Sequence, residues 1–249
     1  MNLSHHPGVQ VREGIAVQID DIIAVESRFR LYLNDQLFSE MIASDDQLKE
    51  LGAGFVVCEG LADEIDSVEV RGTDIRVTAK LQGPMDKEIR SSGCIGVKNP
   101  PGKVHSALSL EKDDIYRITR EIETDLWRKT GGVHCSVLFH GGELVAKSSD
   151  VGRHNTVDKV IGYAILHGID RSSCIVGCTG RQPAGMVGKC AHAGVPVIVS
   201  RAASTDQGIA AADVAGITLI CFSRGPRFTV YTHPERIRDL YRRSGDDTT

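Results

Sequence analysis

The second half of the sequence alternates short apolar runs with helical stretches, and this alternation constrains the fold more than any other feature. The runs at 174–178, 195–199 and 217–222 have the length of buried strands. Between them, Pro183 opens one helix and Ser204 caps the next. Strand–helix repeats at this spacing require right-handed crossovers, so we predict a mostly parallel sheet with helices on its faces. This α/β domain is expected to cover residues 104–240.

Earlier patterns predict further elements. An apolar stripe over 113–129 indicates one helix, and residues 133–140 and 143–149 flank a Gly-Gly turn as a hairpin. The region 8–103 is expected to be a small α+β domain, mainly β, with one short helix that Asp45 and Asp46 cap. Gly, Pro and Ser dominate 90–103, which indicates the domain junction. We expect a disordered tail over 241–249.

Charge and cysteine content narrow the class of protein. The chain has 249 residues, a formal net charge of −4 and a pI near 6.1, which argues against nucleic-acid binding. The first residues lack the apolar core of a signal peptide, and no apolar run reaches membrane-spanning length. Its seven cysteines are scattered and odd in number, which is typical of reduced thiols. We therefore expect a cytoplasmic protein with neither a nucleic-acid nor a membrane partner.

The stretch from Asp150 to Lys159 is the first candidate site. It links a β-like segment to an amphipathic helix, and it places Arg153, His154 and Asn155 at the turn between them. Unpaired backbone N–H groups and the positive end of the helix dipole favour an anion there. The alternative is structural: Asp150 caps the helix and the other polar residues are solvated.

Arginines recur just past the carboxyl ends of the predicted strands. They are Arg153, Arg181, Arg201 and Arg224. Ligands of parallel α/β sheets bind at that edge, and guanidinium groups with helix N-termini suit a polyphosphate. The alternative is four unrelated surface arginines. The standard Gly-rich phosphate motifs are missing, and so is the His-x-Glu with Pro-Cys-x-x-Cys pattern of zinc deaminases. We therefore predict an anion pocket without a metal.

Cys94 lies in the junction, between Gly93 and Gly96. Arg90, Lys98 and Lys103 are close in sequence, and nearby cations favour the nucleophilic thiolate. The alternative is a linker cysteine without a role.

Several segments together resemble one known family. They are Asp150 to Gly162, Thr130 to His134, Gly194 to Arg201, and Phe222 to Arg227 followed by Val230 to Thr232. These segments are similar to the FdhD family, the formate dehydrogenase accessory sulfurtransferases, and the N-terminal helix that runs into 55–60 is also similar. The resemblance covers most of the chain.

The resemblance implies a fold and a function. The larger domain of the family resembles the cytidine deaminase fold without its zinc motif, which implies a three-layer α/β/α domain and no structural metal. Members take persulfide sulfur from a cysteine desulfurase and pass it to the molybdenum cofactor, as the bis-molybdopterin guanine dinucleotide, before its insertion into formate dehydrogenase. GDP or GMP is expected to mimic that cofactor.

The resemblance also assigns residues. The family segment that helps to hold the cofactor matches Phe222, Ser223, Arg224, Gly225, Pro226 and Arg227. The cofactor phosphates are expected on Arg153, Arg181, Arg201 and one of the arginines of that segment, with His154 beside them. The sulfur-carrying loop matches Ser91 to Lys98, which makes Cys94 the expected catalytic residue. His134 or His154 is the candidate for proton transfer, and for His134 the alternative is a hydrogen-bonded histidine at the start of a strand.

One departure from the family bears on the chemistry. The family loop usually holds Cys-x-x-Cys, whereas this chain has Cys94 alone. One nucleophilic sulfur is enough for a persulfide carrier, but a cofactor-binding chaperone without transfer activity is the alternative. A nucleotide hydrolase on a deaminase-like fold is the second rival. A homodimer is possible, and the sequence does not distinguish a molybdenum cofactor from a tungsten cofactor.

Overall fold

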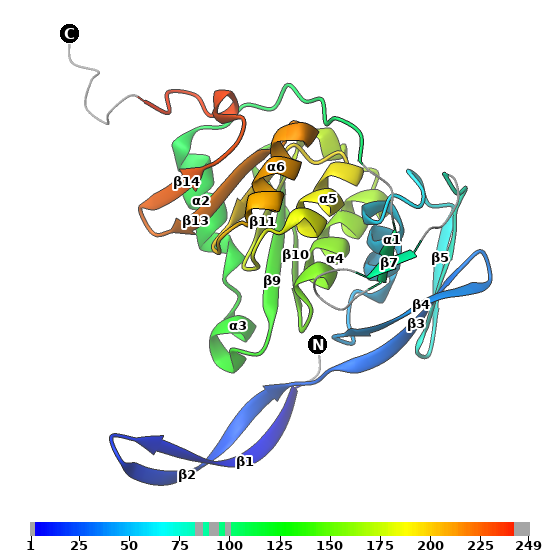
Figure 1. The fold of residues 1–249 in the computed structure, drawn as a ribbon. Helices are drawn as coiled ribbons and strands as arrows, with labels where there is room; N and C mark the ends of the chain where they lie inside the picture. The colour runs from blue at the N-terminus through cyan, green and yellow to red at the C-terminus, as the bar shows by residue number, and fades with distance from the viewer. Residues whose placement is uncertain (1–2, 83–86, 90–94, 98–100, 242–249) are drawn as a thin grey trace.

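The computed structural model describes residues 3–82, 87–89, 95–97 and 101–241, with the backbone alone at 87–89 and 95–97. A small mainly β region lies beside a larger layered α/β region, which confirms the predicted fold class (Figure 1). In the described part of the chain, no helix is long and apolar enough to cross a membrane.

The small region contains a four-stranded sheet and one helix. The sheet has the order β4-β3-β6-β5, formed by β3 (Ser27–Leu33), β4 (Gln36–Ala43), β5 (Ser67–Arg71) and β6 (Asp74–Thr78). Helix α1 (Leu48–Cys58) packs on this sheet through Leu51 and Phe55. The prediction that Asp45 and Asp46 cap α1 was wrong, because Gln47 takes the cap position.

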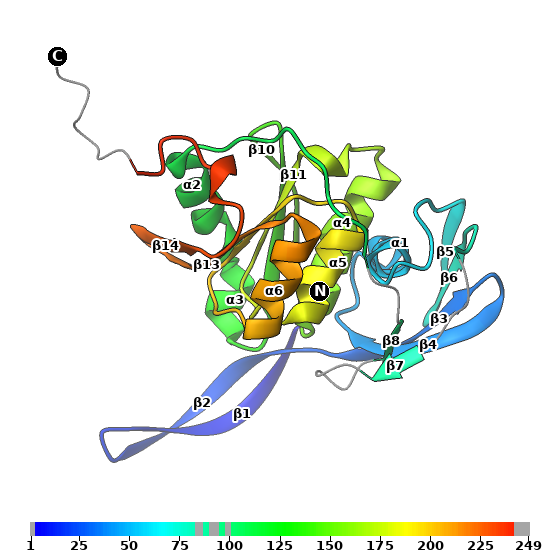
Figure 2. The same cartoon turned by 45° about the horizontal axis from the view of Figure 1, so that its top comes forward.

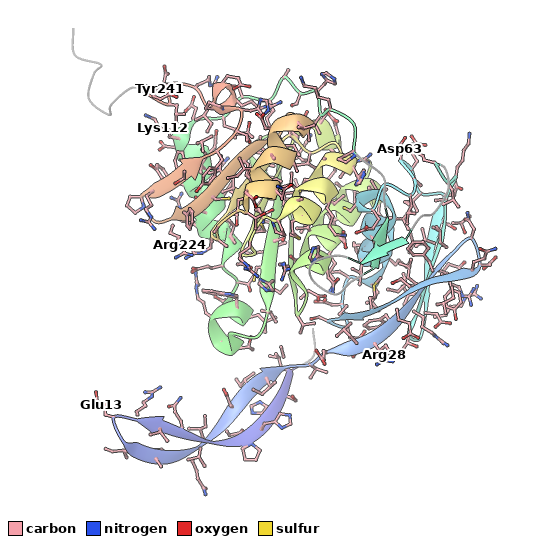
Figure 3. The ribbon with its side chains drawn as sticks, viewed as in Figure 1. Glu13, Arg28, Asp63, Lys112, Arg224 and Tyr241 are labelled. Carbon is pink, nitrogen blue, oxygen red and sulfur yellow. The ribbon has the colours of Figure 1, made fainter. Side chains whose placement is uncertain are left out.

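A long ribbon precedes this sheet. Strands β1 (Leu3–Arg12) and β2 (Ile15–Ala24) pair antiparallel and project from the body, with Glu13 at the tip (Figure 3). In the sequence that follows the small sheet, two short strands, β7 (Lys87–Ile89) and β8 (Ile95–Val97), also pair antiparallel.

The large region is built on a six-stranded sheet of order β10-β9-β11-β12-β13-β14. Its strands are β9 (His134–His140), β10 (Glu143–Asp150), β11 (Cys174–Cys178), β12 (Val197–Ser200), β13 (Thr218–Arg224) and β14 (Arg227–Val230). Only β11, β12 and β13 are parallel neighbours. The prediction of a mostly parallel sheet was therefore wrong for the outer strands. Strand β9 runs antiparallel to both of its neighbours. Strand β14, which the sequence pattern did not predict, returns along β13 as a hairpin.

Helices cover both faces of this sheet (Figure 2). On one face, α2 (Lys112–Ile122) packs Ile115 and Ile118 against Val137 and Ile220. On the other face lie α4 (Arg153–Leu166), α5 (Ala184–His192) and α6 (Asp206–Ala215). Successive strand residues alternate between the two cores, as a pleated strand requires. The α/β/α layering is confirmed.

Two helix limits differ from the prediction. The stripe over 113–129 breaks at Glu123, and α3 (Asp125–Thr130) restarts with the Thr124 hydroxyl accepting the Trp127 N–H. Thr205, and not Ser204, caps α6. Short 3-10 turns at Arg171–Ser173 and Pro234–Arg236 complete the described elements.

Helices α1 and α4 cross at two glycines. A Cβ on Gly54 would fall onto the Asp158 carbonyl oxygen, and a Cβ on Gly162 would fall onto the Glu50 carbonyl oxygen. The backbones approach so closely because neither glycine has a side chain. This crossing joins the small region to the large one and fixes the position of the first turn of α4.

Candidate functional site

The edge of the sheet carries the predicted basic side chains. Strands β10 and β11 both run antiparallel to β9, so β10 to β13 all end at the same edge. Arg153, Arg181 and Arg201 follow β10, β11 and β12, and Arg224 ends β13 at the molecular surface (Figure 3). Four guanidinium groups that are far apart in sequence therefore share one edge.

Arg153 stands at the first position of α4 in an uncapped helix terminus. The N-cap residue is Gly152, which has no side chain to accept the first N–H groups. The Arg153 side chain rests on Gly180, where a Cβ would lie 3.1 Å from the Cβ of Arg153. Its Nε is buried and has no hydrogen-bond partner in the described structure. An anion would satisfy both the helix end and this guanidinium.

The other arginines differ in their partners. Arg201 forms an ion pair with Glu123, with 2.6 Å between Nη1 and Oε1, and lies 5.9 Å from the centre of the Trp127 ring. Arg224 donates from Nε to the Arg201 carbonyl oxygen at 2.8 Å. Arg181 is exposed and makes no side-chain hydrogen bond with described residues. Glu123 therefore compensates the charge of Arg201, and the free positive charge of the edge comes from Arg153, Arg181 and Arg224.

The segment 222–227 has an unusual backbone. Phe222 has a φ of 51°, in the left-handed region that bulky residues avoid, and β13 bulges between Cys221 and Arg224. The Phe222 N–H donates to the Ala202 carbonyl oxygen at 3.0 Å, which holds this conformation. Strain of this kind gathers at ligand sites. Ser223 is fully buried and its hydroxyl lies against Thr119, so its side chain is not available to a ligand.

Gly225, Pro226 and Arg227 form the exposed turn into β14, and the Pro226 carbonyl oxygen accepts from the Tyr116 hydroxyl at 3.2 Å. That these residues bind a cofactor stays a prediction. His154, in the first turn of α4, is half-buried, and its role likewise stays a prediction.

His134 is the first residue of β9 and reaches the same edge. Its Nδ1 lies 3.2 Å from the Thr179 hydroxyl oxygen, just past the end of β11. Burial and the Arg153 guanidinium lower the pKa of His134 below its ordinary value, and Asp150 opposes them. The imidazole is therefore neutral near pH 7.

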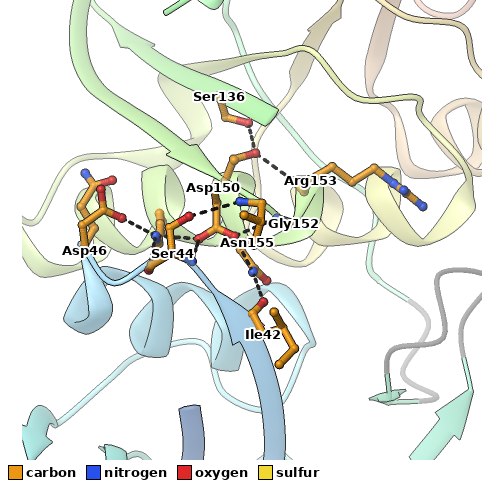
Figure 4. Close-up of polar contacts among 12 residues, drawn as sticks. Ile42, Ser44, Asp46, Ser136, Asp150, Gly152, Arg153 and Asn155 are labelled. Carbon is orange, nitrogen blue, oxygen red and sulfur yellow. Dashed lines mark hydrogen bonds and ion pairs between the residues drawn. The ribbon is translucent and has the colours of Figure 1, made fainter. Parts of the chain in front are cut away.

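Two residues of the central stretch, Asp150 and Lys159, hold α4 against the end of β4. Asp150 is fully buried, lies 2.7 Å from the Lys159 ammonium, and accepts the Ser44 N–H at 3.0 Å. Lys159 also donates to Asp46 at 2.7 Å (Figure 4). Asp150 is therefore not the helix cap; it joins α4 to the end of β4. Arg153 points away from these contacts (Figure 4).

A second buried charge cluster lies between α1, α4 and α5. Lys189 contacts Asp158 and Glu59, each at 2.8 Å. Burial lowers the pKa of Lys189, but the two carboxylates more than offset it, so the net pKa is raised and the ammonium stays charged. The sequence patterns gave no role to Lys159, Asp158 or Lys189. Their signal was available: charged residues within otherwise apolar helix faces.

Cys94 lies outside the described residues. The six other cysteines are buried and free. Burial raises the pKa of Cys178 to about 11 and of Cys174 and Cys221 to about 12. It also raises the pKa of Cys58 and Cys190. These five are therefore thiols near pH 7 and poor nucleophiles. Within the described ranges, no group of three or more His, Cys, Asp or Glu side chains could hold a metal ion.

Comparison with known proteins gives a consistent result. A model of the FdhD/NarQ family matches residues 24–238. The sulfur carrier protein FdhD of Methanothermobacter thermautotrophicus is 34% identical over 244 residues, covering 91% of this chain and 98% of that protein. The protein of the same name from Thermoplasma volcanium is 47% identical over 214 residues, covering 75% of this chain and 77% of that protein.

A solved structure agrees with these relatives. The crystal structure of a protein described as a formate dehydrogenase accessory protein, from Desulfotalea psychrophila, superposes with a TM-score of 0.79 at 31% identity. The match covers 94% of this chain and 99% of that one. The family resemblance seen in the sequence is confirmed: the chain belongs to the FdhD/NarQ family.

Proposed function

We propose that this protein is a sulfur carrier that supports the maturation of a formate dehydrogenase. In this proposal Cys94 receives sulfur from a cysteine desulfurase and passes it to the molybdenum cofactor, the bis-molybdopterin guanine dinucleotide, which is bound as cargo. The observation that carries the proposal is the edge of the sheet where Arg153, Arg181 and the uncapped start of α4 meet. Pyrophosphate groups are the ligand chemistry that such an edge favours.

The first step is a thiol exchange. The Cys94 thiolate attacks the terminal sulfur of the donor persulfide, the donor S–S bond breaks, and the donor thiolate leaves. The sulfur is then held as a persulfide on Cys94 with no net oxidation. The buried, protonated state of the five cysteines described above supports Cys94 as the carrier, because the thiolate is the reactive form.

Relatives support the same role. Proteins that match this chain over most of its length are named sulfur carrier proteins, and the matching crystal structure is described as a formate dehydrogenase accessory protein. We place this protein in the cytoplasm as part of the proposal, because the cysteine desulfurase that donates the sulfur would be found there.

Intact mass tests the carrier. After incubation with a cysteine desulfurase and cysteine, the wild type is expected to gain about 32 Da, one sulfur, through its thiolate. Cys94→Ser is expected to gain nothing, and Cys135→Ser, which removes a buried thiol, is the matched control that should gain sulfur like the wild type. An equal gain in Cys94→Ser would remove Cys94 as the carrier.

Maturation tests the transfer. Cells that depend on this protein for formate dehydrogenase activity should lose that activity with Cys94→Ser. Full activity with this variant would favour the alternative, a chaperone that binds the cofactor and transfers no sulfur.

A further inference from the structure

Thr179 and His134 meet at the sheet edge in a way that limits where the protons are. Thr179 follows β11, and its hydroxyl oxygen accepts the Cys135 N–H at 3.0 Å. That contact uses one lone pair and leaves one hydroxyl proton to place. Two acceptors are within reach: His134 Nδ1 at 3.2 Å and the Cys135 carbonyl oxygen at 3.5 Å.

The carbonyl oxygen is the weaker candidate. It already accepts the Thr179 backbone N–H at 3.0 Å, and the hydroxyl lies at the limit of hydrogen-bond distance from it. The hydroxyl proton therefore points to Nδ1. A neutral imidazole that accepts at Nδ1 carries its own proton on Nε2.

We propose that Thr179 is a positioning residue that fixes the proton of His134 on Nε2, which makes His134 a hydrogen-bond donor to an anionic oxygen at the sheet edge. The identity of that ligand, a phosphate group, rests on the proposed function. In the described structure Nε2 has no hydrogen-bond partner, so it is available to a ligand. This assignment replaces the expected proton-transfer role of His134 by a binding role.

The electrostatic surroundings agree with a neutral donor. The charged groups that act on the ring are Arg153, at the start of α4, and Asp150, at the end of β10. Arg153 and burial oppose a second proton on the ring, and Asp150 is already engaged by Lys159. A fixed neutral donor adds no charge next to Arg153, so both can face the same oxygen.

Nitrogen NMR of the full chain, labelled with 15N-histidine, reads the tautomer directly. The wild type near neutral pH is expected to show His134 with a protonated Nε2 and an unprotonated Nδ1, and His134→Gln assigns the signal. Thr179→Val removes the hydroxyl and is expected to give a mixture of tautomers, whereas Thr179→Ser keeps the wild-type signal. A proton on Nδ1 in the wild type, or an unchanged tautomer in Thr179→Val, would overturn the inference.

Binding of GDP, used as the probe, separates this inference from the proposed function. Thr179→Val is expected to weaken GDP binding by about 3–10-fold and Thr179→Ser by less than about 2-fold, as for the loss and retention of one hydrogen bond. Equal affinity of all three proteins would overturn the donor role. Wild type that carries the Nε2 proton but binds no GDP would uphold the tautomer and contradict the proposed ligand.

Discussion

At the scale of single residues, the side chains of the central stretch have two separate roles. Asp150 and Lys159 turn inward and hold the two regions together, whereas Arg153 turns outward over Gly180 with an unsatisfied Nε. A buried donor without a partner is costly. The most direct explanation is a ligand that supplies the missing acceptor, so Arg153 is the residue to test first.

Arg153→Gln should weaken GDP binding by at least about 10-fold, because hydrogen bonds to charged groups contribute about 1.5–3 kcal/mol. Arg71→Gln, on the exposed β5 strand of the small region, is the matched loss of charge and should bind like the wild type. Isothermal titration calorimetry measures both. Equal losses in the two variants would point to net charge rather than to a site.

His134 should also make stability depend on pH. Its folded-state pKa lies below the ordinary value of 6.5, so the unfolded chain takes up the proton first as the pH falls. The stability that neutral His134 contributes is present above pH 6.5 and is lost as the pH falls through 6.5 toward the folded-state pKa. Urea unfolding between about pH 7.5 and about pH 5.5 should show a smaller loss of unfolding free energy in His134→Gln than in wild type. An identical loss would contradict this.

At the scale of elements, the crossing of α1 and α4 determines whether the sheet edge keeps its shape. Gly54→Ala or Gly162→Ala should cost about 1–3 kcal/mol or more of unfolding free energy, because the new methyl group meets a carbonyl oxygen of the facing helix. Gly188→Ala in α5 has open space around it and is the control. It should be neutral or stabilise the fold by about 0.5–1 kcal/mol. Chemical denaturation of the three variants tests this, and a stable Gly54→Ala would refute the close crossing.

The buried Lys189 tests the same junction by charge. Lys189→Met keeps the length of the side chain but leaves Asp158 and Glu59 facing each other in a dry environment. Removing one partner of a buried ion pair costs about 3–5 kcal/mol. Thermal unfolding should show a clearly lower midpoint, and a wild-type midpoint would mean that the carboxylates find another partner.

Sequence patterns predicted individual strands and hairpins better than the limits of helices or the pairing of strands in the sheet. The hairpin β9–β10 was predictable because alternation and turn residues are local signals. The break between α2 and α3 was missed, since the Thr124 cap lies inside a continuous apolar stripe. The direction of β9 in the sheet was also missed, because a hairpin pattern does not tell which strand pairs with β11.

For the site, the four arginines could be assigned to one edge because strand ends can be counted from sequence. His134 could not, because it begins β9, whose direction in the sheet the sequence did not give. The docking role of Asp150 could not be predicted, because its partner Ser44 lies in another region of the chain and only the folded structure brings them together. The same holds for Thr179, which no motif distinguished from other threonines at strand ends.

At the scale of the whole molecule, α1 belongs to two cores. Phe55 and Leu51 pack with the small sheet, and Val57 and Cys58 pack with α4 and α5. We therefore expect one unfolding transition. The single Trp127, in α3, reports on the large region, and amide exchange in β3 and β6 reports on the small one. Coincident midpoints in denaturant are expected; earlier exchange in β3 and β6 would show two independent domains.

The paired glycines also restrict how the length of the chain can vary. Gly54 faces Asp158 and Gly162 faces Glu50, so each helix offers a glycine and a carbonyl four residues apart, about 6 Å along the axis. The two helices are antiparallel at this crossing and present the same spacing of glycine and carbonyl to each other. One inserted or deleted residue between these positions would rotate the glycine by about 100° relative to the carbonyl of its own helix, so the two contacts could no longer form together. Changes of length are therefore not expected between 50 and 54 or between 158 and 162.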